Sequence, residues 1–346
     1  MELTPLGFES IEALTEFARE PGVARFSDHL ELASSFAWAT WLGDADPNRA
    51  TTLAVREGGR LCAVARLTTT SRRRRVHVGT VEVLAPWQGG DDAVDLALGA
   101  LVRSADAWLQ LSRLELVAPA GHPRVEGVYA AHGFELENTM KDSIRRDGSY
   151  ADEVGLARIR PGFVSPEPLE GPPVAPPRKR GPSNLEIRSL RPEDAEAWTA
   201  TLSDPGVVWG TLQLPHQRSE WWAARIRDDD PARVWVLGAD VGGVIVAGAA
   251  LVLKPAPRRR HCASLGMHVS TKLQGRGIGR RLMNEALALA DSVGIHRVEL
   301  EVYADNPRAL ALYESAGFVH EGRRRMTCFR DGALVDDLMM SRLATG

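Results

Sequence analysis

The chain has 346 residues, of which 44% are hydrophobic and 25% charged, and its formal net charge is −3. That length is too great for one domain of ordinary size and suits two. The near-balanced charge gives no electrostatic reason to expect a nucleic-acid or membrane partner, and we expect neither.

The cysteines are few, odd in number and irregularly spaced, at Cys62, Cys262 and Cys328. This pattern favours a reducing compartment over a secreted, disulfide-stabilised fold. We find no N-terminal apolar signal and no apolar run of membrane-spanning length. We therefore expect a cytoplasmic protein.

Turn signals and prolines divide the chain. Asp147-Gly148 predicts a hairpin between the last two strands of the first half. Prolines and glycines then recur through residues 161–182, a composition that fits neither a helix nor a central strand and predicts a semi-rigid extended linker. We place the domains and the linker at residues 1–158, 159–184 and 185–346.

The second half alternates strand and helix patterns. Strands are expected at 185–190, 234–237, 244–253, 262–269, 298–303, 318–329 and 334–343. One helix is expected to begin at Pro192, and three others are expected to cover 215–226, 280–293 and 306–317. The turn Gly242-Gly243 predicts a hairpin between the second and third of these strands.

The loop Gln274–Gly279, with the sequence Gln-Gly-Arg-Gly-Ile-Gly, stands directly before the helix expected at 280–293. Its three glycines let backbone N–H groups approach a ligand, and the helix points its positive end at the same place. Both features favour a pyrophosphate, and Arg276, Arg280 and Arg281 add cations beside it. The Rossmann and P-loop patterns do not fit these residues. A plain glycine-rich turn is the alternative interpretation of the loop alone.

A second pattern follows at Asn306–Phe318. Asn306 is expected to cap a short helix with Pro307 at its first position, and Gly317 to end it. Together with the loop, this segment resembles the GNAT superfamily of N-acetyltransferases. It matches the family patterns Q/R-x-x-G-x-G/A and N-x-x-A-x-x-x-Y-x-x-x-G-F at every fixed position. The resemblance implies an α+β fold with a mixed, mostly antiparallel sheet flanked by helices, acetyl-CoA as co-substrate, and no metal.

The first half repeats this spacing. The segment His122–Phe134 precedes Asn306–Phe318 by 184 positions (122 to 306), and Asp147-Gly148 precedes Asp331-Gly332 by the same interval. We infer a tandem duplication, and therefore two tandem GNAT domains.

The first copy departs from the family at the loop, where Asp91, Asp92 and Ala93 replace the last three residues of the second copy's loop. Carboxylates in a first helical turn repel a pyrophosphate. We therefore expect residues 1–158 to form a degenerate, structural or regulatory copy. Tyr129, which keeps the family's tyrosine, leaves a second working site as the alternative.

The resemblance implies roles for individual residues of the second half. Tyr313 corresponds to the tyrosine that returns a proton to the departing thiolate. The fourth and fifth strands are expected to diverge, and the pantetheine to lie between them. Acetyl-CoA is expected to contact Met267, His268, Val269, Gln274, Gly275, Arg276, Gly277, Ile278, Gly279, Arg280, Asn306 and Tyr313. The general base stays open among Ser264, His268, Glu299 and Glu301, with His268 taken as the second catalytic residue, and direct attack or a water-relayed proton path is not excluded.

The segment Thr211–His216, followed by Trp221-Trp222, is similar to bacterial GNAT enzymes that acetylate amino acids and related small amines. We expect the acceptor to be a small-molecule primary amine contacting His216, Trp222 and Glu301. The alternatives are a peptide or protein N-acetyltransferase, a tandem GNAT that makes an acylated thiol, and a non-catalytic acetyl-CoA sensor or scaffold. A homodimer is one assembly left open.

Overall fold

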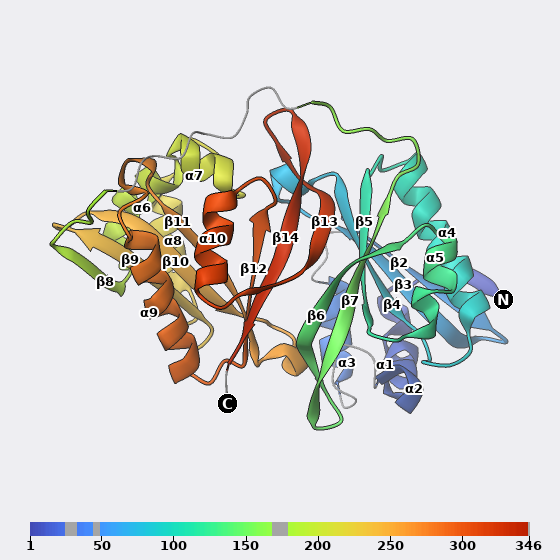
Figure 1. Ribbon diagram of the computed structural model, residues 1–346. Coiled ribbons are helices and arrows are strands. Elements are labelled where there is room, and N and C mark those ends of the chain that lie inside the picture. The colour runs from blue at the N-terminus through green and yellow to red at the C-terminus, as the bar shows by residue number, and fades with distance from the viewer. Residues whose placement is uncertain (25–32, 44–48, 168–178, 345–346) are drawn as a thin grey trace. The chain divides into compact units, whose positions relative to one another are not determined.

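The computed structural model (Figure 1) describes residues 1–24, 33–43, 49–167 and 179–344. Most of the expected linker, at 168–178, lies outside the described residues. The chain divides into two compact units. Unit 1 is Met1–Pro166 with Ala256–Arg259 and Arg324–Phe329, and unit 2 is Glu167–Pro255, Arg260–Arg323 and Arg330–Gly346.

The first half builds a sheet with the strand order β1-β2-β3-β4-β5-β7-β6. Every neighbouring pair is antiparallel except β4 and β5, which are parallel. The strands are β1 (Glu2–Pro5), β2 (Ala50–Glu57), β3 (Arg60–Thr69), β4 (Val78–Leu84), β5 (Arg113–Pro119), β6 (Glu135–Arg146) and β7 (Ser149–Ile159). The helices are α1 (Ile11–Arg19), α2 (Pro21–Ala24), α3 (Ser35–Gly43), α4 (Asp91–Ala107) and α5 (Val128–Ala131).

The second half repeats that order as β8-β9-β10-β11-β12-β14-β13. As in the first half, the fourth and fifth strands, β11 and β12, run parallel. The strands are β8 (Leu185–Ser189), β9 (Val234–Val241), β10 (Ile245–Leu253), β11 (Cys262–Val269), β12 (Arg297–Tyr303), β13 (Val319–Arg330) and β14 (Ala333–Leu343). The helices are α6 (Ala195–Leu202), α7 (Pro205–Gly210), α8 (Ser219–Asp228), α9 (Ile278–Ser292) and α10 (Pro307–Ser315).

The expected fold class is confirmed, because each half is a mixed, mostly antiparallel sheet flanked by helices and both halves share one strand order. The predicted hairpins form where turn chemistry allows them. Gly242 and Gly243, between β9 and β10, both have positive φ, as do Asp147 and Gly148 between β6 and β7. Two successive positive φ angles are what a tight hairpin turn requires.

Helices cover both faces of the second sheet. On α9, the buried positions recur at helical spacing, and this face contacts β8 to β11 (Figure 1). Ala247 and Ala249 of β10 belong to the same hydrophobic cluster as α9. Gly248, which lies between them and faces the opposite side, meets Trp198 of α6.

Among the helix boundaries that differ from the sequence prediction, two have a local cause in the backbone. The helix expected over 215–226 begins at Ser219 instead, and Pro215 precedes it in a turn where His216 has a positive φ of 61°. The helix expected from Arg280 begins at Ile278, because Gly277 takes the left-handed N-cap conformation and the first helical turn then includes the end of the loop.

Each half also buries the same ion-pair network on its fifth strand. Arg297 is 0% exposed, and its guanidinium donates two hydrogen bonds of 2.6 Å to Glu321 and one of 3.1 Å to Glu299. In the first half, Arg113 donates in the same way to Glu137 and Glu115. A buried charge is tolerated only when it is paired and hydrogen-bonded, so each network holds two strand ends in one arrangement.

Replacing Arg297 with Ala should destabilise the protein by about 3–5 kcal/mol, because it leaves the buried Glu321 carboxylate without its partner. The matched control is Arg342→Ala, which breaks the more exposed pair with Asp291 and should cost about 0–1 kcal/mol. Denaturant unfolding followed by tryptophan fluorescence measures both. Equal losses in the two variants would contradict the structural importance of the buried network.

Candidate active site

The parallel ladder between β11 and β12 is short. It pairs Cys262 to Ser264 with Arg297 to Glu299 and continues no further. Beyond it, β11 stays paired with β10 as far as Val269, and β12 with β14 as far as Tyr303. From Leu265 onward, β11 therefore has one edge that no described strand pairs. This is the divergence that the resemblance implied for the fourth and fifth strands.

The loop that follows β11 leads into the N-terminus of α9. Gly275 and Gly277 have φ angles of 76° and 77°, a region that L side chains rarely adopt. A Cβ built on Gly277 meets no atom within 4 Å, so the space in front of this N-cap is open. The first N–H groups of a helix have no intrahelical partner and carry its positive end. This arrangement can bind an anion.

Gly279 lets three elements meet. A Cβ at this position would lie 3.4 Å from Leu312 of α10, 3.5 Å from Val269 and 3.8 Å from Met267. The structure thus brings together the end of β11, the loop and α10, where the sequence predicted cofactor contacts.

Two residues predicted to bind the cofactor use their side chains within the protein. Gln274 donates from Nε2 to the carbonyl of Val269 at 3.0 Å and accepts from Arg308 at 2.9 Å. Asn306 accepts the N–H of Ala309 through Oδ1, as the predicted helix cap should. Arg308 was missed by sequence analysis. It is half-buried, burial lowers its pKa, and it forms no ion pair with any described carboxylate.

Tyr313 points inward from α10 and is 8% exposed, with its ring 6.0 Å from that of Phe318. Burial raises the pKa of its hydroxyl to about 12, so the group stays protonated at neutral pH. Within the described part of the chain, this hydroxyl makes no hydrogen bond. The combination suits a proton donor.

His268 lies on β11 with its ring 4.7 Å from that of Trp198 and nearly perpendicular to it. Burial lowers the pKa of His268 to about 4, so its imidazole is neutral at physiological pH. Its Nε2 atom is buried without a hydrogen-bond partner among the described residues, and the Nε1 atom of Trp198 is in the same condition. Unpartnered buried polar atoms are uncommon and mark this spot as one where a ligand or water is expected.

Aromatic rings connect His268 to the segment Thr211–Trp222, which is expected to line the acceptor pocket and is called the acceptor wall below. Trp222 of α8 packs edge-on against Trp198 with the ring centroids 6.0 Å apart, and its Nε1 donates to Gln217 at 2.7 Å. The residues Trp222, Trp198 and His268 therefore form one row. His216 is exposed and does not join it, and Glu301 is an exposed residue of β12.

Of the other candidates for the general base, Glu299 is engaged in the buried network. Burial alone would raise the pKa of its carboxyl, but Lys254 and Arg297 beside it hold the pKa below its usual range. A carboxylate held by two cations is a poor proton acceptor. Sequence analysis kept Glu299 among the candidates because β-strand alternation does not reveal which side chains form ion pairs.

Two further contacts attach the acceptor wall to the sheet, and sequence analysis missed both. The hydroxyl of Tyr303, at the end of β12, donates to the carbonyl of Thr211 at 3.1 Å. Asp204 caps α7 through the N–H of Gly206 and accepts the N–H of Thr271 at 2.9 Å, just after β11. Burial would raise the pKa of Asp204, but the hydrogen bonds from Thr271 and its neighbours hold it below the usual range.

In the first half, the corresponding loop is filled by the protein itself. Arg124, which is 3% exposed, donates to Asp91 at 2.7 Å and to the carbonyls of Pro86 and Gly89 at 2.7 and 2.6 Å. Asp91 begins α4. An internal carboxylate and guanidinium thus occupy the helix N-terminus that is open in the second half.

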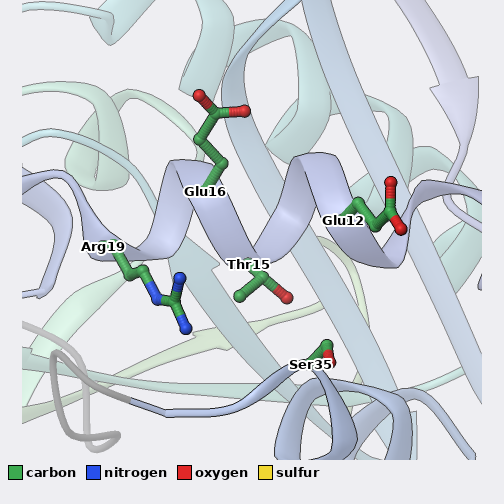
Figure 2. Close-up of a pocket in the computed structure, with 5 residues that line it drawn as sticks. All are labelled: Glu12, Thr15, Glu16, Arg19 and Ser35. Carbon is green, nitrogen blue, oxygen red and sulfur yellow. The ribbon is translucent and has the colours of Figure 1, made fainter.

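A separate cavity of about 460 Å³ lies in the first half, between α1 and the start of α3 (Figure 2). In Figure 2, Thr15 and Arg19 project toward the side of Ser35, whereas Glu12 and Glu16 project from the other side of the helix. None of the predicted site residues lines it. Among the described residues, no His, Cys, Asp and Glu side chains gather into a metal site, and no helix is long and apolar enough to cross a membrane.

Comparison with known proteins places these features in context. The model of the acetyltransferase (GNAT) family matches residues 191–318. The L-amino acid N-acetyltransferase AaaT of Escherichia coli K12 is 32% identical over 162 residues, which cover 46% of this chain and 99% of AaaT. The mycothiol acetyltransferase of Beutenbergia cavernae is 30% identical and covers 60% of this chain and 73% of its own length. That of Salinispora arenicola is 27% identical and covers 73% and 94%.

Asp204→Ala should destabilise the protein by about 2–4 kcal/mol, because it removes a helix cap and leaves the half-buried donors of Thr271 unpaired. Asp230→Ala is the control, since Asp230 also caps a nearby N–H, that of Ala232, but is exposed and should change stability by less than about 1 kcal/mol. Thermal and denaturant unfolding measure the difference. Similar effects of both substitutions would show that Asp204 does not anchor the wall.

Proposed function

The chain belongs to the GNAT family of acetyltransferases, and on this premise we propose that its second half transfers the acetyl group of acetyl-CoA to the primary amine of a small molecule, an amino acid or a related metabolite. One observation carries the proposal. The second half combines an open edge of β11, an unobstructed helix N-terminus at Gly277 and a buried, protonated Tyr313. AaaT supports the acceptor class, since its name specifies L-amino acids and nearly its whole length aligns here.

We take residues 185–346 as the catalytic domain and residues 1–158 as the degenerate copy, joined by 159–184. The last strand of the first half ends at Ile159, and the first strand of the second half begins at Leu185. The self-filled loop around Arg124 and Asp91 supports this division of labour, because the carboxylate repels a phosphate and the guanidinium takes up the space.

The residues of the second half fit acetyl-CoA. The N–H groups at Gly277, Ile278 and Gly279 would hold its pyrophosphate at the positive end of α9. The free edge of β11 at Met267 and Val269 would bind the pantetheine as an added strand, through main-chain hydrogen bonds. When bound, acetyl-CoA supplies an activated thioester carbonyl.

Tyr313 is proposed to return a proton to the departing thiolate. The Tyr313 side chain is largely buried on α10, and the raised pKa of its hydroxyl keeps the proton in place until a stronger base forms next to it. A backbone N–H near Val269 would stabilise the negative charge that develops on the carbonyl oxygen.

His268 is proposed to act as a neutral imidazole. A base with a pKa of about 4 cannot remove a proton from a stable ammonium ion, so the acceptor enters as the free amine. As the new N–C bond forms, the nitrogen becomes acidic. His268 can then accept its proton directly or through a water molecule.

The aromatic row of Trp222 and Trp198 leads to His268 and supports a walled pocket for a small acceptor. Apolar walls with few charges suit an amino acid better than a polycation. Contacts from His216 and Glu301 stay predictions, and the exposure of both residues would place them at the rim of such a pocket.

A second candidate is acetylation of a mycothiol-type acceptor. The mycothiol acetyltransferase of Salinispora arenicola aligns over both halves of this chain, whereas AaaT aligns over 46% of it. An acetylation screen that includes amino acids, polyamines, aminoglycosides and the amine precursor of mycothiol separates the two candidates. Acetylation of amino acids supports the first proposal. Acetylation of the thiol precursor with none of amino acids supports the second.

Tyr313→Phe should lower kcat roughly ten- to a thousandfold, because the proton donor is lost while ring packing remains. Affinity for acetyl-CoA and the unfolding midpoint should change little. Steady-state kinetics and calorimetry measure these quantities. Full activity of the variant would assign Tyr313 a structural role.

The pH dependence of the rate should follow the acceptor and not His268. Because burial lowers the pKa of His268 to about 4, its imidazole stays neutral between about pH 5 and 9 and contributes no inflection there. The rate should rise with pH as the amine loses its proton and level off near the pKa of the amine. Profiles with two acceptors of different amine pKa test this. An inflection at the same pH for both would identify an enzyme group instead.

A further inference from the structure

The chain segment just before β8 lies against the loop that leads into α9. The N–H of Lys179 donates to the carbonyl of Gly275 at 3.0 Å. Two residues later, Gly181 passes so close to the loop that an added Cβ would lie 2.6 Å from the carbonyl oxygen of Arg276. We call residues Lys179–Gly181 the strap. It meets the loop backbone to backbone.

The strap contacts two carbonyl groups of the loop, that of Gly275 through a hydrogen bond and that of Arg276 through close packing, and the N–H groups of the same two peptide units point away from it. In a planar trans peptide, C=O and N–H point in opposite directions, and the described chain contains no cis peptide. The hydrogen bond to the carbonyl of Gly275 therefore orients the N–H of Arg276, and the close approach of Gly181 to the carbonyl oxygen of Arg276 limits the orientations open to the N–H of Gly277. Neither N–H has a partner among the described residues. Both are left for a ligand at the N-terminus of α9.

A loop with this composition needs such support. Glycine has the widest backbone freedom of any residue, so ordering Gly275 and Gly277 costs more conformational entropy than ordering other residues would. Strap contacts order them before a ligand arrives, so that binding need not. The strap is itself held close by, since only 182–184 separate it from the buried Leu185 at the start of β8.

In the first half, a side chain and not the main chain contacts the equivalent loop carbonyl. Gly89 corresponds to Gly275 when Gln88 is aligned with Gln274, and its carbonyl accepts from the guanidinium of Arg124 at 2.6 Å. The counterpart of Arg124 in the second half is Arg308, which bonds Gln274 instead. In the second half, the main chain of the strap takes the place that a guanidinium fills in the first, and the loop stays open for an anion.

We propose that the strap is a positioning element of the cofactor site, which aims the N–H groups of Arg276 and Gly277 at the pyrophosphate of acetyl-CoA. This inference rests on the proposed function. The end of the segment that joins the two halves then also contributes to the affinity for the cofactor.

The strap acts through its main chain, so backbone substitutions test it. Gly181→Ala adds the Cβ that overlaps the Arg276 carbonyl, and Lys179→Pro removes the N–H that Gly275 accepts. In calorimetric titrations of the full chain, each should raise the Kd for acetyl-CoA roughly ten- to a hundredfold. Ser183→Ala, an exposed position two residues beyond the strap, is the control and should bind as the wild type does.

Lys179→Ala distinguishes the contribution of the main-chain N–H from that of the side-chain ammonium group. It keeps the N–H and should bind acetyl-CoA roughly tenfold more tightly than Lys179→Pro. Equal weakening by the two substitutions would mean that the ammonium group contacts the cofactor, and would overturn the proposal. So would wild-type affinity in Gly181→Ala and Lys179→Pro. No binding by the wild-type protein would instead refute the proposed function.

Limited trypsin digestion gives a readout independent of the variants. If strap docking strengthens acetyl-CoA binding, linkage requires that acetyl-CoA strengthen strap docking by the same factor. Acetyl-CoA should therefore slow cleavage after Arg180 severalfold and leave cleavage after the exposed Arg72 in the first half unchanged. Identical cleavage rates after Arg180 with and without acetyl-CoA would contradict the proposal.

Discussion

The arrangement of the second half depends on the short parallel ladder between β11 and β12, which pairs the first residues of the two strands and then ends. Arg297 and Glu299 begin β12 and are held by ion pairs, Arg297 with the buried Glu321 and Glu299 with Lys254, at the same positions where β12 pairs with β11. Beyond these positions each strand keeps only its outer antiparallel neighbour. Because β10 and β14 hold the two strands in place, the unpaired edge of β11 persists without collapse. The loop, α9 and α10 are all attached to the ends of these diverging strands.

The two halves differ mainly in what satisfies one helix N-terminus. In the first half, the carboxylate of Asp91 stands at the start of α4 and is neutralised by Arg124, so the site is complete without a ligand. In the second half, Gly277 stands at the position equivalent to Asp91, so this position carries no carboxylate. Arg308 forms no ion pair with any described residue. The positive end of α9 and this cation therefore favour an external anion. Both halves keep the same scaffold and buried networks, and we infer that a few residues decide which half can bind acetyl-CoA.

The sequence predicted those parts of the site that local patterns encode. The cap at Asn306, the inward-facing Tyr313 and the glycine loop follow from residues within one or two turns of each other. The missed contacts join distant segments, such as Asp204 with Thr271 and Tyr303 with Thr211, and no local pattern specifies them. The prediction for Glu299 failed to anticipate its ion pairs for the same reason. The start of α9 was placed two residues late, because the left-handed conformation of Gly277 allows Ile278 and Gly279 to join the helix.

The central claim is that acetyl-CoA binds the second half alone, and calorimetric titration of the full chain tests it most directly. Wild-type protein should bind acetyl-CoA at one strong site per chain. Gly277→Asp, which imports the residue found at the equivalent position of the first half, should abolish that site, because the side chain blocks the approach to the loop amides and its charge opposes the pyrophosphate. Two strong sites in the wild type, or one site that survives in Gly277→Asp, would contradict the account.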